Sequence, residues 1–265
     1  MATLACLNQK GGVGKTSICF HISGTLAAMG RRVLLLDADP QASLTQGFWG
    51  PQFTRRLAAD ETVAAVFAGD AIPDKVIRPA GITGVDLLPG SRLATDYNVP
   101  NPHLAEWPLQ TSLRDFLDGV AGLYNTVLID CPPNLHLCSW SALVASTHII
   151  VPLQPEDFGS QGLADVHESI DRVRSGPNPL LSLCGYVLNM VNSRATVHRV
   201  FEERLRSLYG SDVLDTKIPL SLDFKESIVA RKPVAQHKPR GVAAKAVRAL
   251  ADELTSRLES AHVQV

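Results

Sequence analysis

The sequence lacks several features that would each indicate a particular class of protein. Its five cysteines form no C-x-x-C pair, so neither a disulfide framework nor a zinc site is indicated. It contains no run of about 18 consecutive apolar residues, which a membrane span requires, and its N-terminus shows no signal-peptide pattern. The formal net charge of −1 points to no polyanionic partner for the chain as a whole. We therefore expect a cytoplasmic protein with reduced thiols.

What the sequence does contain is a series of short apolar runs separated by segments of helical periodicity. Strands are expected at residues 3–8, 32–39, 126–133, 148–155 and 183–191, with a shorter one at 85–91. A helix is expected from Lys15 to Met29, ending at Gly30. Continuous apolar strands alternating with helices are typical of a parallel sheet covered on both faces. We predict an α/β fold with a mostly parallel twisted sheet, in a single domain over residues 1–265.

The stretch NQKGGVGKTS, residues 8–17, indicates a phosphate-binding loop. Its glycines let the backbone fold closely around phosphate oxygens, and the following helix offers its positive N-terminal end. Lys15 is expected to reach the β- and γ-phosphates of a nucleotide, and the Thr16 hydroxyl to bind Mg²⁺. The expected nucleotide contacts are Lys10, Gly11, Gly12, Val13, Gly14, Lys15, Thr16 and Ser17.

This loop departs from the usual G-x-x-x-x-G-K-[ST] pattern in two ways. The position of the first glycine is occupied by Gln9, and the next residue, Lys10, is a second lysine at the outer lip of the loop. The ordinary pattern gives that second lysine no role.

Three aspartates lie at the carboxyl ends of predicted strands, the edge at which parallel sheets bind ligands. Asp130 fits the carboxylate that holds a Mg²⁺ ion through water, with capping of the next element as the alternative. Asp37 and Asp39 leave their strand on the same side, because side chains alternate along a strand. We assign Asp39 to the attacking water and Asp37 to the metal shell. Turn formation before proline is the alternative for both.

The segments KGGVGKTS, VLLLDADPQAS and YNTVLIDCPPN together resemble the deviant Walker A, switch I and switch II motifs of the ParA/MinD family of P-loop ATPases. IIVPLQPEDFGSQGL is similar to a further strand and helix of that family. Residues 217–254 resemble the C-terminal part of Soj-like ParA partition ATPases. The resemblance implies the P-loop NTPase fold and a weak ATPase activity that a partner protein stimulates. We expect no helix-turn-helix domain before the first strand.

The resemblance also gives the second lysine a role. Lys10 matches the signature lysine of the family, which reaches across an ATP-dependent sandwich dimer to the phosphates bound in the partner subunit. Its charge can stabilise the transferring phosphoryl group, as an arginine finger does. The implied catalytic residues are therefore Lys10, Lys15 and Asp39, acting in a homodimer.

The resemblance further places Asn189 near the adenine, whose edge its amide can bind by donating and accepting hydrogen bonds. Asn192 is the alternative, and the loop around Pro219 is expected to border the base through its backbone. The alternative for Asn189 is that it simply ends a strand and has no role in nucleotide binding.

A basic stretch, residues 217–248, carries eight basic and two acidic residues. In ParA-like proteins this region binds DNA without sequence preference, through phosphate contacts that salt weakens. The candidate DNA contacts are Lys225, Arg231, Lys232, Lys238 and Arg240. A solvated basic face is the alternative, and DNA binding would make the protein nucleoid-associated.

The resemblance thus implies an ATPase that segregates plasmid or chromosomal DNA together with a centromere-binding protein or another cargo adaptor. Positioning of a protein cargo, such as a microcompartment or a chemoreceptor cluster, is an alternative. A MinD-like membrane-associated ATPase is another, but the apolar stripe Val247, Leu250, Leu254 and Leu258 indicates a core-packing helix. An iron–sulfur reductase is disfavoured, because no cysteine lies between Cys19 and Cys131 to serve as a second cluster ligand. Nothing marks the substrate pocket of a small-molecule ligase with the same loop.

Overall fold

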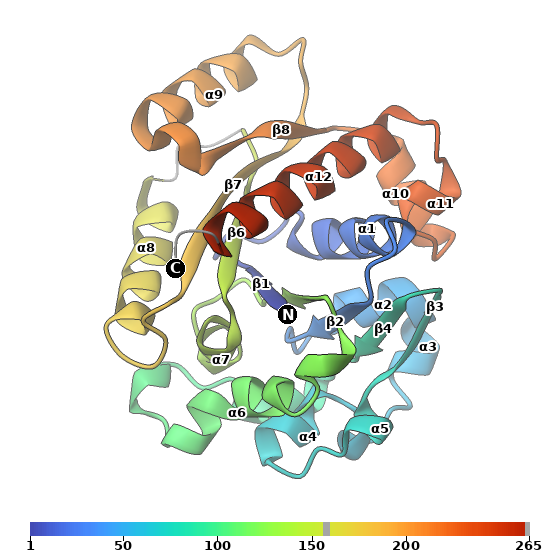
Figure 1. The fold of residues 1–265 in the computed structure, drawn as a ribbon, viewed down its shortest axis with the longest axis vertical. Coiled ribbons are helices and arrows are strands. Elements are labelled where there is room, and N and C mark those ends of the chain that lie inside the picture. Colours follow the sequence, from blue (N-terminus) through green and yellow to red (C-terminus); the bar gives the residue numbers. More distant parts are fainter. Residues whose placement is uncertain (156–159, 263–265) are drawn as a thin grey trace.

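A computed structural model describes residues 1–155 and 160–262 of the chain (Figure 1). The described residues form an eight-stranded sheet with the order β3-β4-β2-β5-β1-β6-β7-β8. Its strands are β1 (Ala2–Cys6), β2 (Val33–Asp37), β3 (Arg78–Ile82), β4 (Val85–Leu88), β5 (Thr126–Asp130), β6 (His148–Leu153), β7 (Ser182–Val191) and β8 (Val213–Pro219). The neighbouring pairs are parallel except β3 and β4. The predicted mostly parallel sheet is confirmed.

The predicted strands are all present, but several end earlier than expected. β2 stops at Asp37 and β5 at Asp130, so that the residues after these aspartates belong to loops. Two strands, β3 and β8, were not predicted. β3 has the sequence RPAGI, whose proline and glycine are unfavourable in a central strand but tolerated at the edge that β3 occupies. Residues 156–159, part of the stretch similar to a family strand and helix, lie outside the described residues.

Helices cover both faces of the sheet (Figure 1). They are α1 (Lys15–Ala28), α2 (Ser43–Trp49), α3 (Pro51–Thr54), α4 (Val63–Ala68), α5 (Pro73–Val76), α6 (Trp107–Asp118), α7 (Leu137–Ala145), α8 (Ser160–Arg174), α9 (Thr196–Tyr209), α10 (Leu222–Val229), α11 (Val234–His237) and α12 (Val242–His262). One core lies between the sheet and α4, α6, α7, α8 and α9, and the other between the sheet and α1, α2 and α12. In the described part of the chain, no helix is long and apolar enough to cross a membrane.

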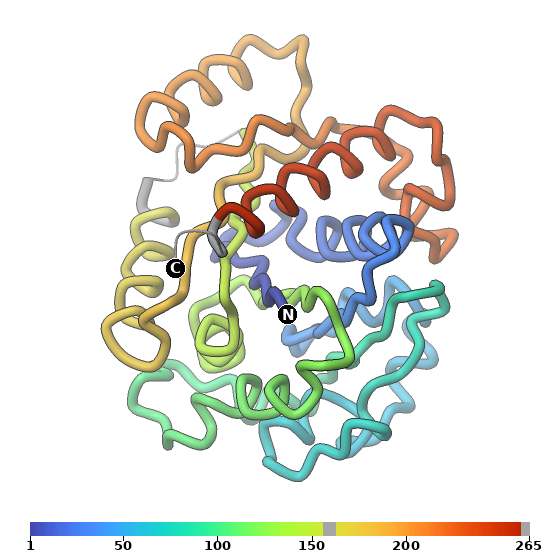
Figure 2. The backbone as a smooth tube through the Cα atoms, viewed as in Figure 1, coloured from blue at the N-terminus to red at the C-terminus, as the bar shows by residue number. Residues whose placement is uncertain are grey.

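Helix α1 connects the beginning of the chain to its end. Figure 2 shows α1, in blue, beside α12, in red, and the two helices are in contact. Gly24 allows the segment before α11 to approach closely, because a Cβ atom there would lie 2.5 Å from Cβ of Pro233. The stripe of Val247, Leu250 and Leu254 on α12 is buried, which confirms that this helix packs on the core.

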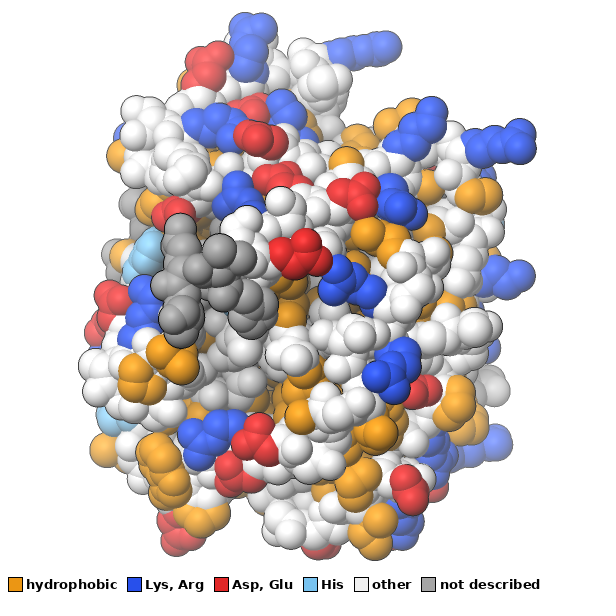
Figure 3. Space-filling view, in the orientation of Figure 1, with side chains coloured by type: hydrophobic (Ala, Val, Ile, Leu, Met, Phe, Trp, Pro, Cys, Tyr) orange, Lys and Arg blue, Asp and Glu red, His pale blue; other side chains and the backbone are white. Residues whose placement is uncertain are grey.

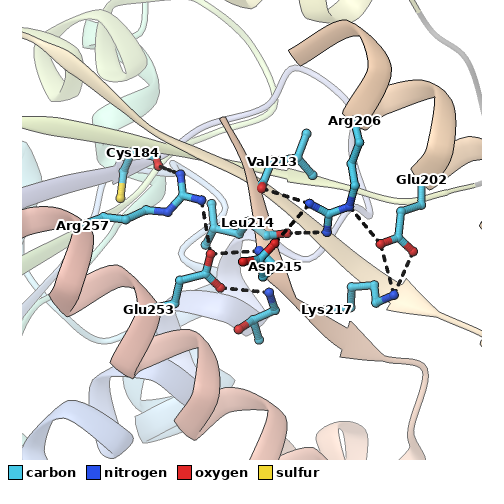
Figure 4. A network of polar contacts seen from close by, with 10 residues as sticks. Cys184, Glu202, Arg206, Val213, Leu214, Asp215, Lys217, Glu253 and Arg257 are labelled. Carbon is cyan, nitrogen blue, oxygen red and sulfur yellow. Dashed lines mark hydrogen bonds and ion pairs between the residues drawn. The ribbon is translucent and has the colours of Figure 1, made fainter. Parts of the chain in front are cut away.

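The open edge of β8 is covered by side chains from two helices (Figure 4). The Glu253 carboxylate of α12 accepts hydrogen bonds from the main-chain N–H groups of Asp215 and Thr216, at 2.8 and 2.9 Å. Arg206 of α9 donates to the carbonyls of Leu214, at 2.9 Å, and Val213, at 3.2 Å. These contacts occupy backbone groups that another strand could otherwise pair with, so this edge is protected against strand addition.

Candidate functional site

A cavity of about 420 Å³ lies at the carboxyl edge of the sheet, where the loop between β1 and α1 faces α2 and α10. It is lined by Gly11, Gly12, Gly14, Lys15, Thr16, Ser17, Phe20, Asp39, Ser43, Gly47, Pro133 and Ile228. Most of the predicted loop residues and one of the predicted aspartates therefore share one cavity.

The loop takes a shape that requires glycine at its last turn. Gly14 has φ of +92°, a conformation that residues with a Cβ atom rarely adopt. A Cβ atom at this position would also lie 2.1 Å from Nδ2 of Asn189. Helix α1 begins at the next residue, so its unpaired N–H groups face the cavity and favour an anion there.

Lys15 is buried, with 6% of its surface exposed. Its ammonium group donates hydrogen bonds to the main-chain carbonyls of Asn8, at 2.8 Å, and Lys10, at 3.1 Å. A buried ammonium group whose partners are neutral carbonyls is well placed to exchange them for phosphate oxygens.

The side chains of Thr16 and Asp130, which were both expected near a magnesium ion, are in direct contact. The Thr16 hydroxyl donates to Oδ2 of Asp130 at 2.7 Å. The second oxygen of that carboxylate, Oδ1, is buried and has no hydrogen-bond partner among the described residues. Burial, and then the nearby Asp37 carboxylate, raise the pKa of Asp130 well above its usual range. A cation, or water bound to it, would supply the missing partner and favour the ionised form.

Among the described residues, no group of three or more His, Cys, Asp or Glu side chains is arranged to hold a metal ion.

The two aspartates after β2 have different surroundings. The buried Asp37 accepts hydrogen bonds through Oδ2 from the N–H and the hydroxyl of Thr45, at 2.8 and 2.7 Å, and so holds the first turn of α2. Asp39 is half-buried, lines the cavity and accepts a hydrogen bond from the N–H of Gln41. Burial raises the pKa of Asp39, and the positive charge of Lys15 opposes that rise. The metal-shell role of Asp37 stays a prediction, and its carboxylate already has a structural task.

The predicted contacts to the adenine base lie in β7, just after it, and at the end of β8. Asn189 is buried and donates through Nδ2 to the carbonyl of Val13 at 2.7 Å, while its Oδ1 accepts from the N–H of Met190. Both functions of its amide are thus engaged within the chain. Asn192 is exposed and forms a local turn with Arg194, and Pro219 is half-buried at the end of β8. The adenine contacts stay predictions.

The five candidate DNA contacts are all exposed but differ in their partners. Lys238 lies 2.7 Å from the carboxylates of both Asp223 and Glu226, which raise its pKa. Arg231 packs against Gly50, where a Cβ atom would meet its guanidinium group.

Within the described part of the chain, no ion-pair partner is found for Lys225, Lys232 or Arg240. Figure 3 shows basic side chains protruding from the surface in the area of α10 and α11. These three residues are therefore the better candidates for contacts with phosphate.

The sequence reasoning missed four residues that shape the site. Asn8 and Thr45 hold the loop and Asp37 through hydrogen bonds. Phe20 and Ile228 form apolar walls of the cavity. Asn8 and Thr45 lie within or beside the quoted motifs and could have been suspected there, but nothing in the sequence connects Ile228 to the loop.

Comparison with known proteins adds a second line of information. Residues 1–183 match the family described as AAA domain. The chain is 34% identical over 258 residues to the chromosome-partitioning ATPase Soj of Thermus thermophilus, with 97% of each chain covered. It is also 34% identical over 260 residues to the chromosome partitioning protein ParA of Caulobacter vibrioides, covering 97% of this chain and 95% of that protein.

A solved structure is similar along nearly its whole length. The cobyrinic acid a,c-diamide synthase of Mycobacterium smegmatis with bound ADP and magnesium superposes with a TM-score of 0.81 at 29% identity. The match covers 98% of this chain and 96% of that one.

Proposed function

The chain belongs to the ParA/MinD family of P-loop ATPases, and from that premise we propose that it is a partition ATPase of the Soj/ParA type that uses ATP and Mg²⁺. The observation that carries the proposal is the contact between Thr16 and Asp130, beside a loop that holds Lys15. The other oxygen of the Asp130 carboxylate has no hydrogen-bond partner within residues 1–155 and 160–262. A loop built only to connect a strand to a helix has no need of a buried lysine beside a carboxylate that has one oxygen without a hydrogen-bond partner in the described part of the chain.

The residues present fit a magnesium ion bound with a nucleotide. Thr16 would hold the ion through its hydroxyl and Asp130 through water, and Lys15 would hold the phosphates. The ion, when bound, neutralises charge on the phosphate oxygens. Asp39 lines the same cavity and, when ionised, would orient the attacking water and accept a hydrogen bond from it.

Lys10 serves the partner subunit in this proposal. Its side chain is exposed at the outer lip of the loop, while Lys15 is directed into its own loop. Two subunits facing each other across their nucleotides would each offer Lys10 to the other's phosphates, so ATP would stabilise the dimer and hydrolysis would release it.

The ATP-bound dimer binds DNA non-specifically through Lys225, Lys232 and Arg240, and a cargo adaptor stimulates a slow hydrolysis. The exposed positions of these residues support this step, as do the two partitioning relatives. The protein is then nucleoid-associated, and its cargo is a plasmid or a chromosomal origin.

A ligase is the second candidate, because the similar structure from Mycobacterium smegmatis has the name of an amide-forming synthase. A ligase couples phosphate release to an acid and an amine substrate. Phosphate release from ATP and Mg²⁺ alone, further stimulated by DNA or by an adaptor, would exclude coupling of that kind.

The test compares DNA with anionic liposomes as binding partners of the same preparation, with ATP, ADP or no nucleotide. We expect DNA retention only with ATP, weakening steeply as salt rises, and no sedimentation with liposomes. The Asp39→Ala variant should bind ATP and stay on DNA, because it cannot complete hydrolysis. Sedimentation with liposomes and indifference to DNA would instead identify a membrane-associated ATPase.

A further inference from the structure

Two asparagine side chains hold the phosphate loop, one on each flank. On the first flank, the buried Asn8 donates through Nδ2 to the carbonyl of Pro152 in β6 at 2.7 Å, and its Oδ1 accepts from the N–H of Lys10 at 2.9 Å. On the second flank, Asn189 of β7 donates to the carbonyl of Val13 at 2.7 Å. Each amide thus ties the loop to a fixed strand of the sheet.

We propose that Asn8 is a positioning residue for Lys10, an inference that rests on the role of Lys10 in the proposed function. β6 is the neighbour of β1 in the sheet, so the carbonyl of Pro152 is a rigid anchor for the Asn8 amide. The same amide fixes the N–H of Lys10 and with it the direction in which the Lys10 side chain leaves the loop. A side chain that must meet phosphates in another subunit depends on such a fixed direction, because small misplacements weaken catalysis strongly.

The two lysines of the loop use different parts of Asn8. Lys15 is bonded to the main-chain carbonyl of Asn8, whereas the N–H of Lys10 is bonded to its side chain. Removing the side chain therefore leaves the carbonyl that Lys15 uses. An Asn8→Ala variant should keep the loop's own phosphate-binding half and lose control of Lys10.

Asn189 provides the matched comparison, since it has the same chemistry on the opposite flank. It holds the peptide that directly precedes Gly14 and Lys15. An Asn189→Ala variant should loosen the half of the loop that binds the subunit's own nucleotide. The two substitutions should therefore weaken different functions.

Asn178 serves as the control for a merely structural asparagine. Its side-chain amide donates to the carbonyls of Leu143, Val144 and Ser146 at the end of α7, away from the loop. Asn178→Ala should lower the melting temperature and leave nucleotide affinity and turnover unchanged at temperatures below unfolding.

The experiment measures three quantities for the Asn8→Ala, Asn189→Ala, Asn178→Ala and Lys10→Ala variants. They are the affinity for a fluorescent ADP analogue, the steady-state turnover of ATP, and the ATP-dependent dimer fraction by light scattering. ADP is chosen because the proposed dimer needs ATP, so its affinity reports the single subunit. Hydrogen exchange at the amide of residue 10 gives a direct structural reading for the variants that keep Lys10.

For Asn8→Ala we expect ADP affinity close to that of the unaltered protein, turnover and dimer formation reduced by about 10- to 100-fold, and faster exchange at the Lys10 amide. Asn189→Ala should lose ADP affinity first. If Asn8→Ala retains full turnover and dimer formation while Lys10→Ala loses both, the inference is wrong and the proposed function survives. If Lys10→Ala itself dimerises and turns over normally, the proposed function fails. Equal losses of ADP affinity and turnover in Asn8→Ala would show general support of the loop and also overturn the inference.

Discussion

The phosphate loop and the region of α10 and α11 both contain lysines proposed to bind phosphate, but the surroundings of these lysines differ. Lys15 in the phosphate loop is 6% exposed and bonded to two main-chain carbonyls. Lys225 and Lys232, around α10 and α11, are exposed and have no ion-pair partner in the described part of the chain. A buried ammonium group interacts strongly with a single phosphate site, because the surrounding dielectric constant is low. Exposed charges interact weakly one by one, attract a polyanion through their combined charge, and are screened by salt.

The basic stretch also contains its own contrast. Lys238 has two carboxylate partners, and Lys217 and Arg248 each have one, from Glu202 and Asp252. Positive charge in the sequence therefore does not translate directly into positive charge that a phosphate can reach. Alanine variants that remove these charges test whether the buried lysine, the unpaired exposed residues and the paired lysine differ in their effects on binding.

The largest expected effect is that of Lys15→Ala. Removing a buried ammonium group that would contact phosphates should weaken nucleotide affinity by about 100-fold or more, measured by titration with a fluorescent ADP analogue. Lys245→Ala is the control, because it removes an exposed lysine from α12 that lies outside the candidate DNA contacts. Undiminished affinity in Lys15→Ala would remove the loop assignment and the contrast with it.

An intermediate effect is expected when Lys225, Lys232 and Arg240 are all replaced by alanine. DNA affinity at saturating ATP should fall, and the slope of log affinity against log salt should become shallower by about 3, roughly one for each lost phosphate contact. The measurement is DNA binding by anisotropy across a salt series.

Lys238→Ala is the matched control for that triple variant. It should change the salt slope less than any one of the three, because Asp223 and Glu226 already neutralise its charge. A slope change as large as that of the triple variant would mean that this ion pair opens on DNA, and the distinction between paired and unpaired lysines would fail.

The smallest effect concerns His21, where the two regions touch. Its Nδ1 accepts a hydrogen bond from the N–H of Val234 at 3.1 Å, and its ring contacts Phe20 and Phe224. Burial lowers the pKa of His21 to about 3. The neutral form is thus the folded form, and its contribution is complete above the unfolded pKa, near 6.5, and is lost as pH falls from there toward 3.

We expect this histidine to lower the free energy of unfolding by about 2 kcal/mol between pH 7 and pH 5. The measurement is urea unfolding of the unaltered protein and of His21→Leu at both pH values. The difference between the two proteins removes the opposing contribution of the buried carboxylates Asp37 and Asp130, whose pKa values are raised. Identical pH dependence in both would show that His21 is not the titrating group.

Much of the fold could be predicted because its signals are local. The buried strands are continuous apolar runs. Helix α1 ends at Ala28, one residue before the expected Met29, and Gly30 has a left-handed conformation at φ of +82°. β3 and β8 escaped prediction because they are edge strands of mixed composition, and their place depends on partners distant in the chain.

Part of the candidate site, too, could be predicted from the sequence because its signals are local. The sequence by itself determined the loop, because consecutive residues and the glycines at its turns set the backbone that receives phosphate. It also placed Asp39 and Asp130 at the correct edge of the sheet, since strand direction follows from the parallel order.

Only the tertiary structure decided which neighbouring groups each of these side chains meets. In the folded chain, Asp37 is hydrogen-bonded to Thr45, Asn8 to the carbonyl of Pro152, and Asn189 to the carbonyl of Val13. Lys238 forms an ion pair with Asp223. Such choices depend on contacts between segments that are distant along the chain, and burial multiplies the energetic weight of each contact. A sequence names the groups that can do chemistry, whereas the packing of the whole chain determines which of them remain available for it.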